Sequence, residues 1–152
     1  MTRFTREIAQ KALDIAMPFL EQIIKQEERK GISVNIGYRN PVRPQDTKAN
    51  RPIYGLTIGD GEDYIEIAMS KYELTLETGL SSREVQLLHP EATGGKDQTK
   101  FWGSWIDGFI IVAISGLPPE WDEACSKFIC GVIKALLTTQ SIQDFASDKK
   151  FT

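Results

Sequence analysis

The one histidine of this chain, His89, is the residue on which any imidazole chemistry would depend. It precedes a proline in a polar loop, where an exposed side chain is favoured over a ligand to a metal or haem iron. A catalytic triad or a zinc cluster would need partners for His89, and the two cysteines, Cys125 and Cys130, lie on one predicted helix at the wrong spacing. The sequence therefore nominates no catalytic residue and no metal site, and it predicts two reduced, free thiols.

A second candidate binding site, in this case for an anion, is the turn at Ser115 and Gly116, which separates a predicted strand from a predicted helix. Backbone N–H groups at such a helix start can bind an anion. Prolines at 118 and 119 remove two of these donors, and the carboxylates between 120 and 123 would repel an anion. We therefore expect no phosphate site, and the helix dipole explains the carboxylates better than acid–base catalysis does.

Two tryptophans, Trp102 and Trp105, lie on the predicted outer arm of a hairpin. Residues three apart on a strand fall on opposite faces, so at most one indole can enter the core. The other is left for a ligand, a subunit partner or a groove, and a subunit interface is favoured over a small-molecule pocket. His89 and the two tryptophans are thus the candidate ligand-binding residues.

The hydrophobic pattern predicts the elements that position these residues. Apolar residues at helical spacing indicate a helix from the N-cap Thr5 to about residue 30, with a kink or break at Pro18. Period-two alternation predicts half-buried strands at 32–38 and 53–58, paired as a hairpin. Two further helices are expected at 65–76, closed by Gly79, and at 82–88, where Ser81, Ser82 and Glu84 fit a capping box.

The second half of the chain is expected to end in a hairpin and a helix. Asp107 and Gly108 are a favoured tight-turn pair, and the run 109–114 predicts a buried strand after them. The last helix is expected from Pro119 to about Thr139, before a frayed polar tail over 141–152. Its predicted buried stripe consists of Trp121, Cys125, Phe128, Val132 and Leu136. This order of elements favours an α+β fold with an antiparallel sheet.

Length and composition limit the class of protein. The 152 residues, 41% of them hydrophobic, suit one domain over 1–152. A net charge of −3 gives no electrostatic reason to expect a nucleic-acid partner. The polar N-terminus lacks the order of a signal peptide, and no apolar run approaches the ~20 residues of a membrane span. We expect a soluble, cytoplasmic protein that binds neither membrane nor nucleic acid.

Several of these residues resemble the motifs of the GlcG/HbpS-like family. Its members carry a strand ending in Val-Ser-Gly and an aspartate on the last helix, which Ser115, Gly116 and Asp122 match here. Lys71, preceded by Ala68, looks like the family's Ala-x-x-Lys on its middle helix. Where the family often has Gly-Gly-x-Pro before the final hairpin, this chain has Phe-Trp-Gly-Ser-Trp at 101–105.

The resemblance implies a profilin-like three-layer α/β/α fold with a five-stranded antiparallel sheet, frequent homo-oligomers, and haem or corrinoid-related binding in some members. It does not imply catalysis. We therefore expect an oligomeric cytosolic protein that binds haem or a related tetrapyrrole, with His89 the strongest candidate for an iron ligand. The alternative is a structural or assembly factor that acts only through protein contacts, and a small enzyme with an unfamiliar site ranks third.

Overall fold

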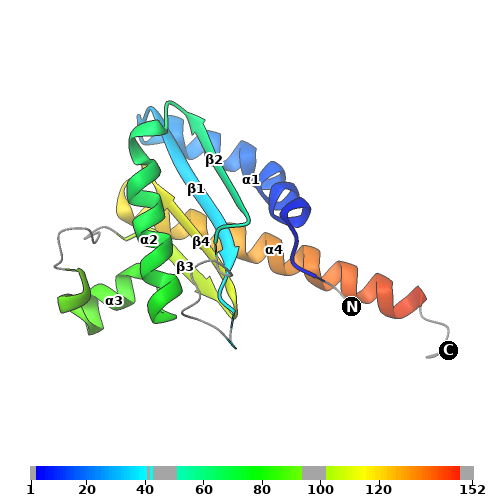
Figure 1. Ribbon diagram of the computed structural model, residues 1–152. Coiled ribbons are helices and arrows are strands. Elements are labelled where there is room, and N and C mark those ends of the chain that lie inside the picture. The colour runs from blue at the N-terminus through cyan, green and yellow to red at the C-terminus, as the bar shows by residue number, and fades with distance from the viewer. Residues whose placement is uncertain (1–2, 41, 43–50, 94–101, 148–152) are drawn as a thin grey trace.

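The computed structural model describes residues 3–40, 42, 51–93 and 102–147. In chain order the elements are α1 (Arg6–Gln26), β1 (Gly31–Tyr38), β2 (Tyr54–Gly59), the 3-10 helix η1 (Glu62–Tyr64), α2 (Ile65–Thr78), α3 (Ser82–Leu88), the 3-10 helix η2 (Pro90–Thr93), β3 (Ser104–Asp107), β4 (Ile110–Ser115) and α4 (Pro119–Ser147) (Figure 1). The predicted order of helices and strands is confirmed.

The strands form one antiparallel sheet in the order β2-β1-β4-β3. Helices α1 and α4 pack together on one face, and α2 covers the other with α3 beside it (Figure 1). The described part of the chain therefore has the expected α+β class and three layers. Its sheet contains four strands, so the predicted count of five is not confirmed.

Two apolar cores lie on the two faces of the sheet. The larger joins α1 and α4 to Ile32, Val34 and Ile36 of β1 and to alternate residues of β4. The smaller joins Tyr72 of α2 to Ile111 of β4. Because helices cover both faces, β1 is buried along almost its whole length and is not the half-buried strand that its alternation predicts.

The predicted helix ends are confirmed where a local signal marks them. The Thr5 hydroxyl accepts a hydrogen bond from the Ile8 N–H at 3.3 Å, and α2 ends at Gly79 with a φ of 73°. Helix α1 is continuous through Pro18, so the predicted break is wrong. Pro18 is exposed, and the carbonyl that loses its helical donor can therefore be hydrated.

Two boundaries in the second half differ from the prediction. Asp107 pairs with Ile110, so the tight turn consists of Gly108, whose φ is 63°, and Phe109. Helix α4 continues past the predicted end near Thr139 to Ser147, because no glycine or proline interrupts the sequence after residue 131. None of the described helices combines the length and apolar composition needed to cross a membrane.

Candidate functional site: a buried ion pair and the end of α3

Lys71 of α2 and Asp122 of α4 form a buried ion pair. The Lys71 Nζ lies 3.0 Å from Asp122 Oδ2, and the side chains are 1% and 2% exposed. Lys71 also donates to the Ile114 carbonyl at 2.9 Å, and Asp122 Oδ1 accepts from the Leu117 N–H at 3.0 Å. The pair thus ties together α2, the end of β4 and the start of α4.

Burial is the largest influence on the ionisation of both groups. It raises the pKa of the Asp122 carboxyl to about 7 and lowers the pKa of the Lys71 ammonium. The opposite charge of each partner and their shared hydrogen bond act against burial in both cases. Burial thus shifts the pKa of both groups towards their neutral forms, and perturbed carboxyl and ammonium groups of this kind are common at functional sites.

Gly103 is packed directly against this pair. Its φ is 142°, and a Cβ there would lie 2.6 Å from Lys71 Nζ and 2.8 Å from the Cβ of Asp122. Only glycine leaves room for the ammonium at this point. Nothing in the neighbouring sequence predicts this role, because the atoms that Gly103 makes room for come from α2 and α4.

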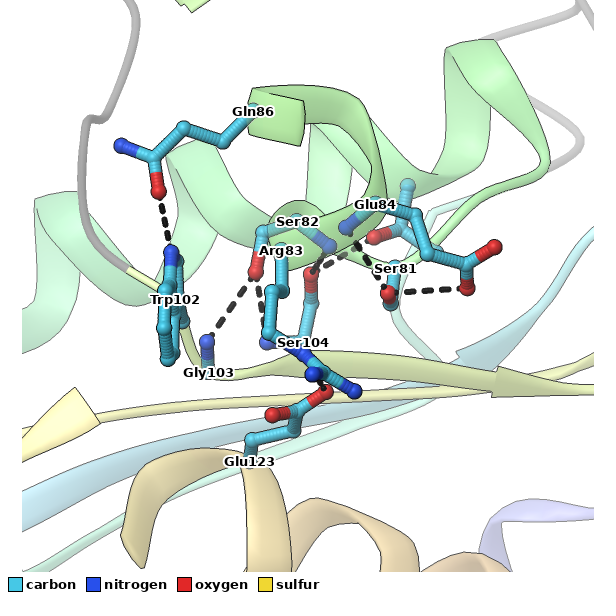
Figure 2. Close-up of polar contacts among 10 residues, drawn as sticks. Ser81, Ser82, Arg83, Glu84, Gln86, Trp102, Gly103, Ser104 and Glu123 are labelled. Carbon is cyan, nitrogen blue, oxygen red and sulfur yellow. Dashed lines mark hydrogen bonds and ion pairs between the residues drawn. The ribbon is translucent and has the colours of Figure 1, made fainter. Parts of the chain in front are cut away.

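A buried network of hydroxyl groups surrounds Gly103 (Figure 2). The Ser82 hydroxyl accepts from the N–H groups of Gly103 and Ser104 at 3.0 and 3.1 Å, and the Ser104 hydroxyl accepts from the Ser82 N–H at 3.0 Å. On the α4 side, the Ser126 hydroxyl donates to the Gly103 carbonyl at 2.6 Å. These bonds hold the β3 entry between α3 and α4, and none of the serines was singled out for this role from the sequence.

The predicted buried stripe of α4 is partly wrong. Phe128 is 41% exposed, whereas Asp122, Glu123 and Ser126 are buried. Asp122 faces inward because Lys71 neutralises it, and Glu123 faces inward because Arg83 of α3 pairs with it at 3.1 Å (Figure 2). These two carboxylates are therefore ion-pair partners, and the helix dipole alone does not explain them.

Of the two tryptophans, only Trp105 lies in the sheet, because β3 begins at Ser104 and not at the predicted start near Phe101. Trp105 packs on the larger core, with Lys127 Nζ 4.2 Å from its ring centroid. Trp102 lies against α3, where its indole N–H donates to Gln86 (Figure 2) and the Arg83 guanidinium lies 5.8 Å from its ring centroid. Each indole is half-buried by contacts within the chain.

His89 is the C-cap of α3. Its side chain is 55% exposed, and its Nδ1 lies 3.4 Å from Glu91 Oε1. Gln86, the partner of Trp102, precedes it by three residues on α3. The structure thus places His89 at the end of α3 and Trp102 against the same helix, and it places Trp105 on the larger core.

The four family-motif residues all meet in one place. Lys71, Ser115, Gly116 and Asp122 line a pocket of about 230 Å³ beyond the end of β4. Gly116 has a φ of 128°, and a Cβ there would lie 2.5 Å from the Gly31 carbonyl oxygen. This close approach brings β4 against the start of β1 and sets one wall of the pocket.

Comparison with known proteins gives a fold. No protein-family model and no curated protein sequence matches this chain. Among solved structures, HbpS superposes with a TM-score of 0.61 at 19% identity, over 87% of this chain and 91% of that chain. The Klebsiella pneumoniae protein ORFY superposes with a TM-score of 0.62 at 13% identity, over 89% of this chain and 93% of that chain. PduOC, solved as a complex with haem, superposes with a TM-score of 0.54 at 15% identity, over 80% of this chain and 91% of that chain.

Proposed function

We propose, on the premise that this chain has the fold of the GlcG/HbpS-like proteins, that it is a non-catalytic binding protein for haem or a related tetrapyrrole. The observation that carries the proposal is the exposed position of His89 at an apolar helix end, on a fold shared with a protein that was solved with haem. The ligand site proposed here is the end of α3, with His89 and Trp102 as its main residues.

The side chains at this end of α3 fit a surface-bound haem. The contact of His89 Nδ1 with Glu91 leaves Nε2 as the nitrogen available to iron, and a carboxylate partner of this kind orients histidine ligands in many metal sites. Leu87 and Leu88 are 69% and 62% exposed, which is unusual for neighbouring leucines and offers apolar contact to a porphyrin ring. When bound, haem would supply an iron that a histidine nitrogen such as that of His89 could hold.

A positive group for the haem propionates is also present. Arg83 lies beside Trp102 and is 39% exposed, although it already pairs with Glu123. An arginine can satisfy more than one carboxylate because its guanidinium carries five N–H donors. Arg83 would therefore bind a propionate without giving up its contact with α4.

We further propose that the protein is cytoplasmic and assembles as a homo-oligomer. Two buried free cysteines suit a reducing compartment. On the outer side of α1 and α4, Ile15, Phe19 and Phe128 are 51%, 37% and 41% exposed, and the two phenylalanine rings lie 4.8 Å apart. This apolar face, rather than the tryptophan arm, is the surface that a second copy would cover.

The same apolar face favours the second candidate function, a structural or assembly factor that acts through protein contacts. A titration with haemin separates the two functions. A saturable Soret band at a fixed stoichiometry supports the haem-binding protein. A purely additive spectrum, with no saturation, supports the assembly factor.

A further inference from the structure

The pocket beyond the end of β4 is separate from the α3 end and has a composition of its own. Its volume is about 230 Å³, and it is lined by residues of η1, α2 and α4, by the last residue of β4, and by the turns that follow α1 and β4. Apolar walls come from Tyr64, Ile67 and Leu117. A water molecule occupies about 30 Å³ in the liquid, so the space holds roughly eight non-hydrogen atoms.

Ser115 supplies the first indication of a ligand. Ser115 as a whole is 4% exposed, and among the described residues its hydroxyl has no hydrogen-bond partner. In the described part of the chain every fully enclosed side-chain nitrogen or oxygen is hydrogen-bonded. The Ser115 hydroxyl must therefore reach the pocket that Ser115 lines, where a ligand can satisfy it.

The charges around the pocket select the kind of ligand. Lys71 and Asp122 neutralise one another, and Arg29 adds a positive charge that has no ion-pair partner among the described residues. Asp63, next to Tyr64 in the chain, is already engaged by Lys30. The groups that line the pocket thus carry a net charge of about +1, which attracts a monoanion.

The hydrogen-bonding groups agree with the charges. An ammonium has three N–H groups, and Lys71 uses two of them on Ile114 and Asp122. Asp122 has little remaining capacity to accept hydrogen bonds from a ligand, because its two oxygens already accept from Lys71 and from the Leu117 N–H. Donors from Arg29, Lys71 and Ser115 therefore outnumber the acceptors that remain.

We propose that this pocket binds a small monocarboxylate. Its carboxylate accepts hydrogen bonds from Arg29, Lys71 and the Ser115 hydroxyl, and its short apolar chain packs against Tyr64 and Ile67. This proposal does not depend on haem binding, because the two sites share no residue.

The test is an NMR titration of the full chain with sodium propionate, at constant ionic strength. We expect saturable shifts of the backbone amides at 115–117, and no comparable shifts with propionamide, the neutral molecule of the same shape. Ser115→Ala and Arg29→Gln should each weaken binding about tenfold, which is the loss of one charge-assisted hydrogen bond. As a control, Lys25→Gln removes a charge from an exposed position near the end of α1, four residues before Arg29, and should change affinity by less than about twofold.

A stability measurement separates ligand binding from a structural role. Ser115→Ala removes a hydroxyl that bonds no other described residue, so the unliganded variant should be about as stable as the wild type while it binds propionate more weakly. Equal shifts with propionate and propionamide would overturn the proposal. So would the absence of saturable binding, or wild-type affinity in both pocket variants.

Discussion

Lys71 and Asp122, 51 positions apart in the chain, join the two helical layers through a 3.0 Å contact past the end of the sheet. Removing two charges from water is costly, and their attraction offsets that cost only while both are present. Each of the two charges is therefore tolerated in the interior only while its partner is present.

We predict strong energetic coupling between these two residues. Lys71→Met should lower the free energy of unfolding by about 3–5 kcal/mol, because it leaves Asp122 buried without a counter-charge. Asp122→Leu should be similarly destabilising, and the double variant should recover most of the loss. Urea unfolding of all four proteins measures the coupling, and simple additivity of the two losses would contradict it.

Gly103→Ala should be far more damaging than its size suggests. The new Cβ would meet the Ile114 carbonyl oxygen at 2.5 Å and Lys71 Nζ at 2.6 Å, in a backbone conformation that favours glycine. We expect a loss of at least about 2 kcal/mol.

The matched control for this change is Gly131→Ala, on the exposed side of α4, where a Cβ meets nothing within 4 Å. It should raise stability by about 0.5–1 kcal/mol, because alanine favours the helix. Thermal unfolding of both variants measures the difference. Equal changes in melting temperature would show that Gly103 is not needed to make room for the Lys71–Asp122 pair.

Both cysteines should be unreactive in the native protein. Burial raises the pKa of Cys125 to about 12, with a smaller contribution from Asp122, and burial likewise raises the pKa of Cys130. At pH 8 a thiol reagent should modify two thiols in the unfolded chain and none in the folded one. Rapid labelling without unfolding would refute their placement in the core.

The same shift predicts how stability depends on pH. A thiol pKa raised by folding means that the native state binds the thiol proton more tightly than the unfolded chain does. The resulting contribution of the thiol to the free energy of unfolding is fully present below the ordinary pKa of 9.0 and is lost as the pH rises above it. The free energy of unfolding should fall as pH rises above about 9, by up to about 1.4 kcal/mol per pH unit for each thiol. A shallower slope in Cys125→Ala would confirm the assignment, and an identical slope would oppose it.

The apolar face on α1 and α4 should control assembly. Phe19→Ser together with Phe128→Ser removes both exposed rings, and light scattering should then show a smaller assembly than the wild type. Trp102→Phe, which leaves that face intact, should keep the wild-type mass. A wild-type monomer across the micromolar range would show that the face has another purpose.

Local signals in the sequence were sufficient for much of the fold. Thr5, Ser81 and Gly79 mark helix ends through bonds or backbone angles that depend only on neighbouring residues, and all three are confirmed. The hairpins also follow from local alternation and turn residues, apart from a one-residue shift at Gly108.

The candidate site depends on contacts between residues that are far apart in the chain. Local sequence patterns could not predict these contacts. The inward face of α4 includes Asp122 and Glu123, which look like surface residues until Lys71 and Arg83 are seen opposite them. The resemblance selected Lys71 and Asp122 without indicating that they touch. Gly103 carries no local signal, because its role is to leave space for a side chain from another layer.

The most direct test of the central proposal is a haemin titration followed by the Soret band, performed in parallel on the wild type, His89→Ala and Phe145→Ala. Phe145 is 63% exposed on α4 and controls for adsorption of haem to an unrelated apolar surface. We predict saturable binding to the wild type and to Phe145→Ala, with at least a tenfold weaker affinity and an altered Soret maximum in His89→Ala. Unchanged spectra and affinity in His89→Ala, or no saturable binding to the wild type, would contradict the account.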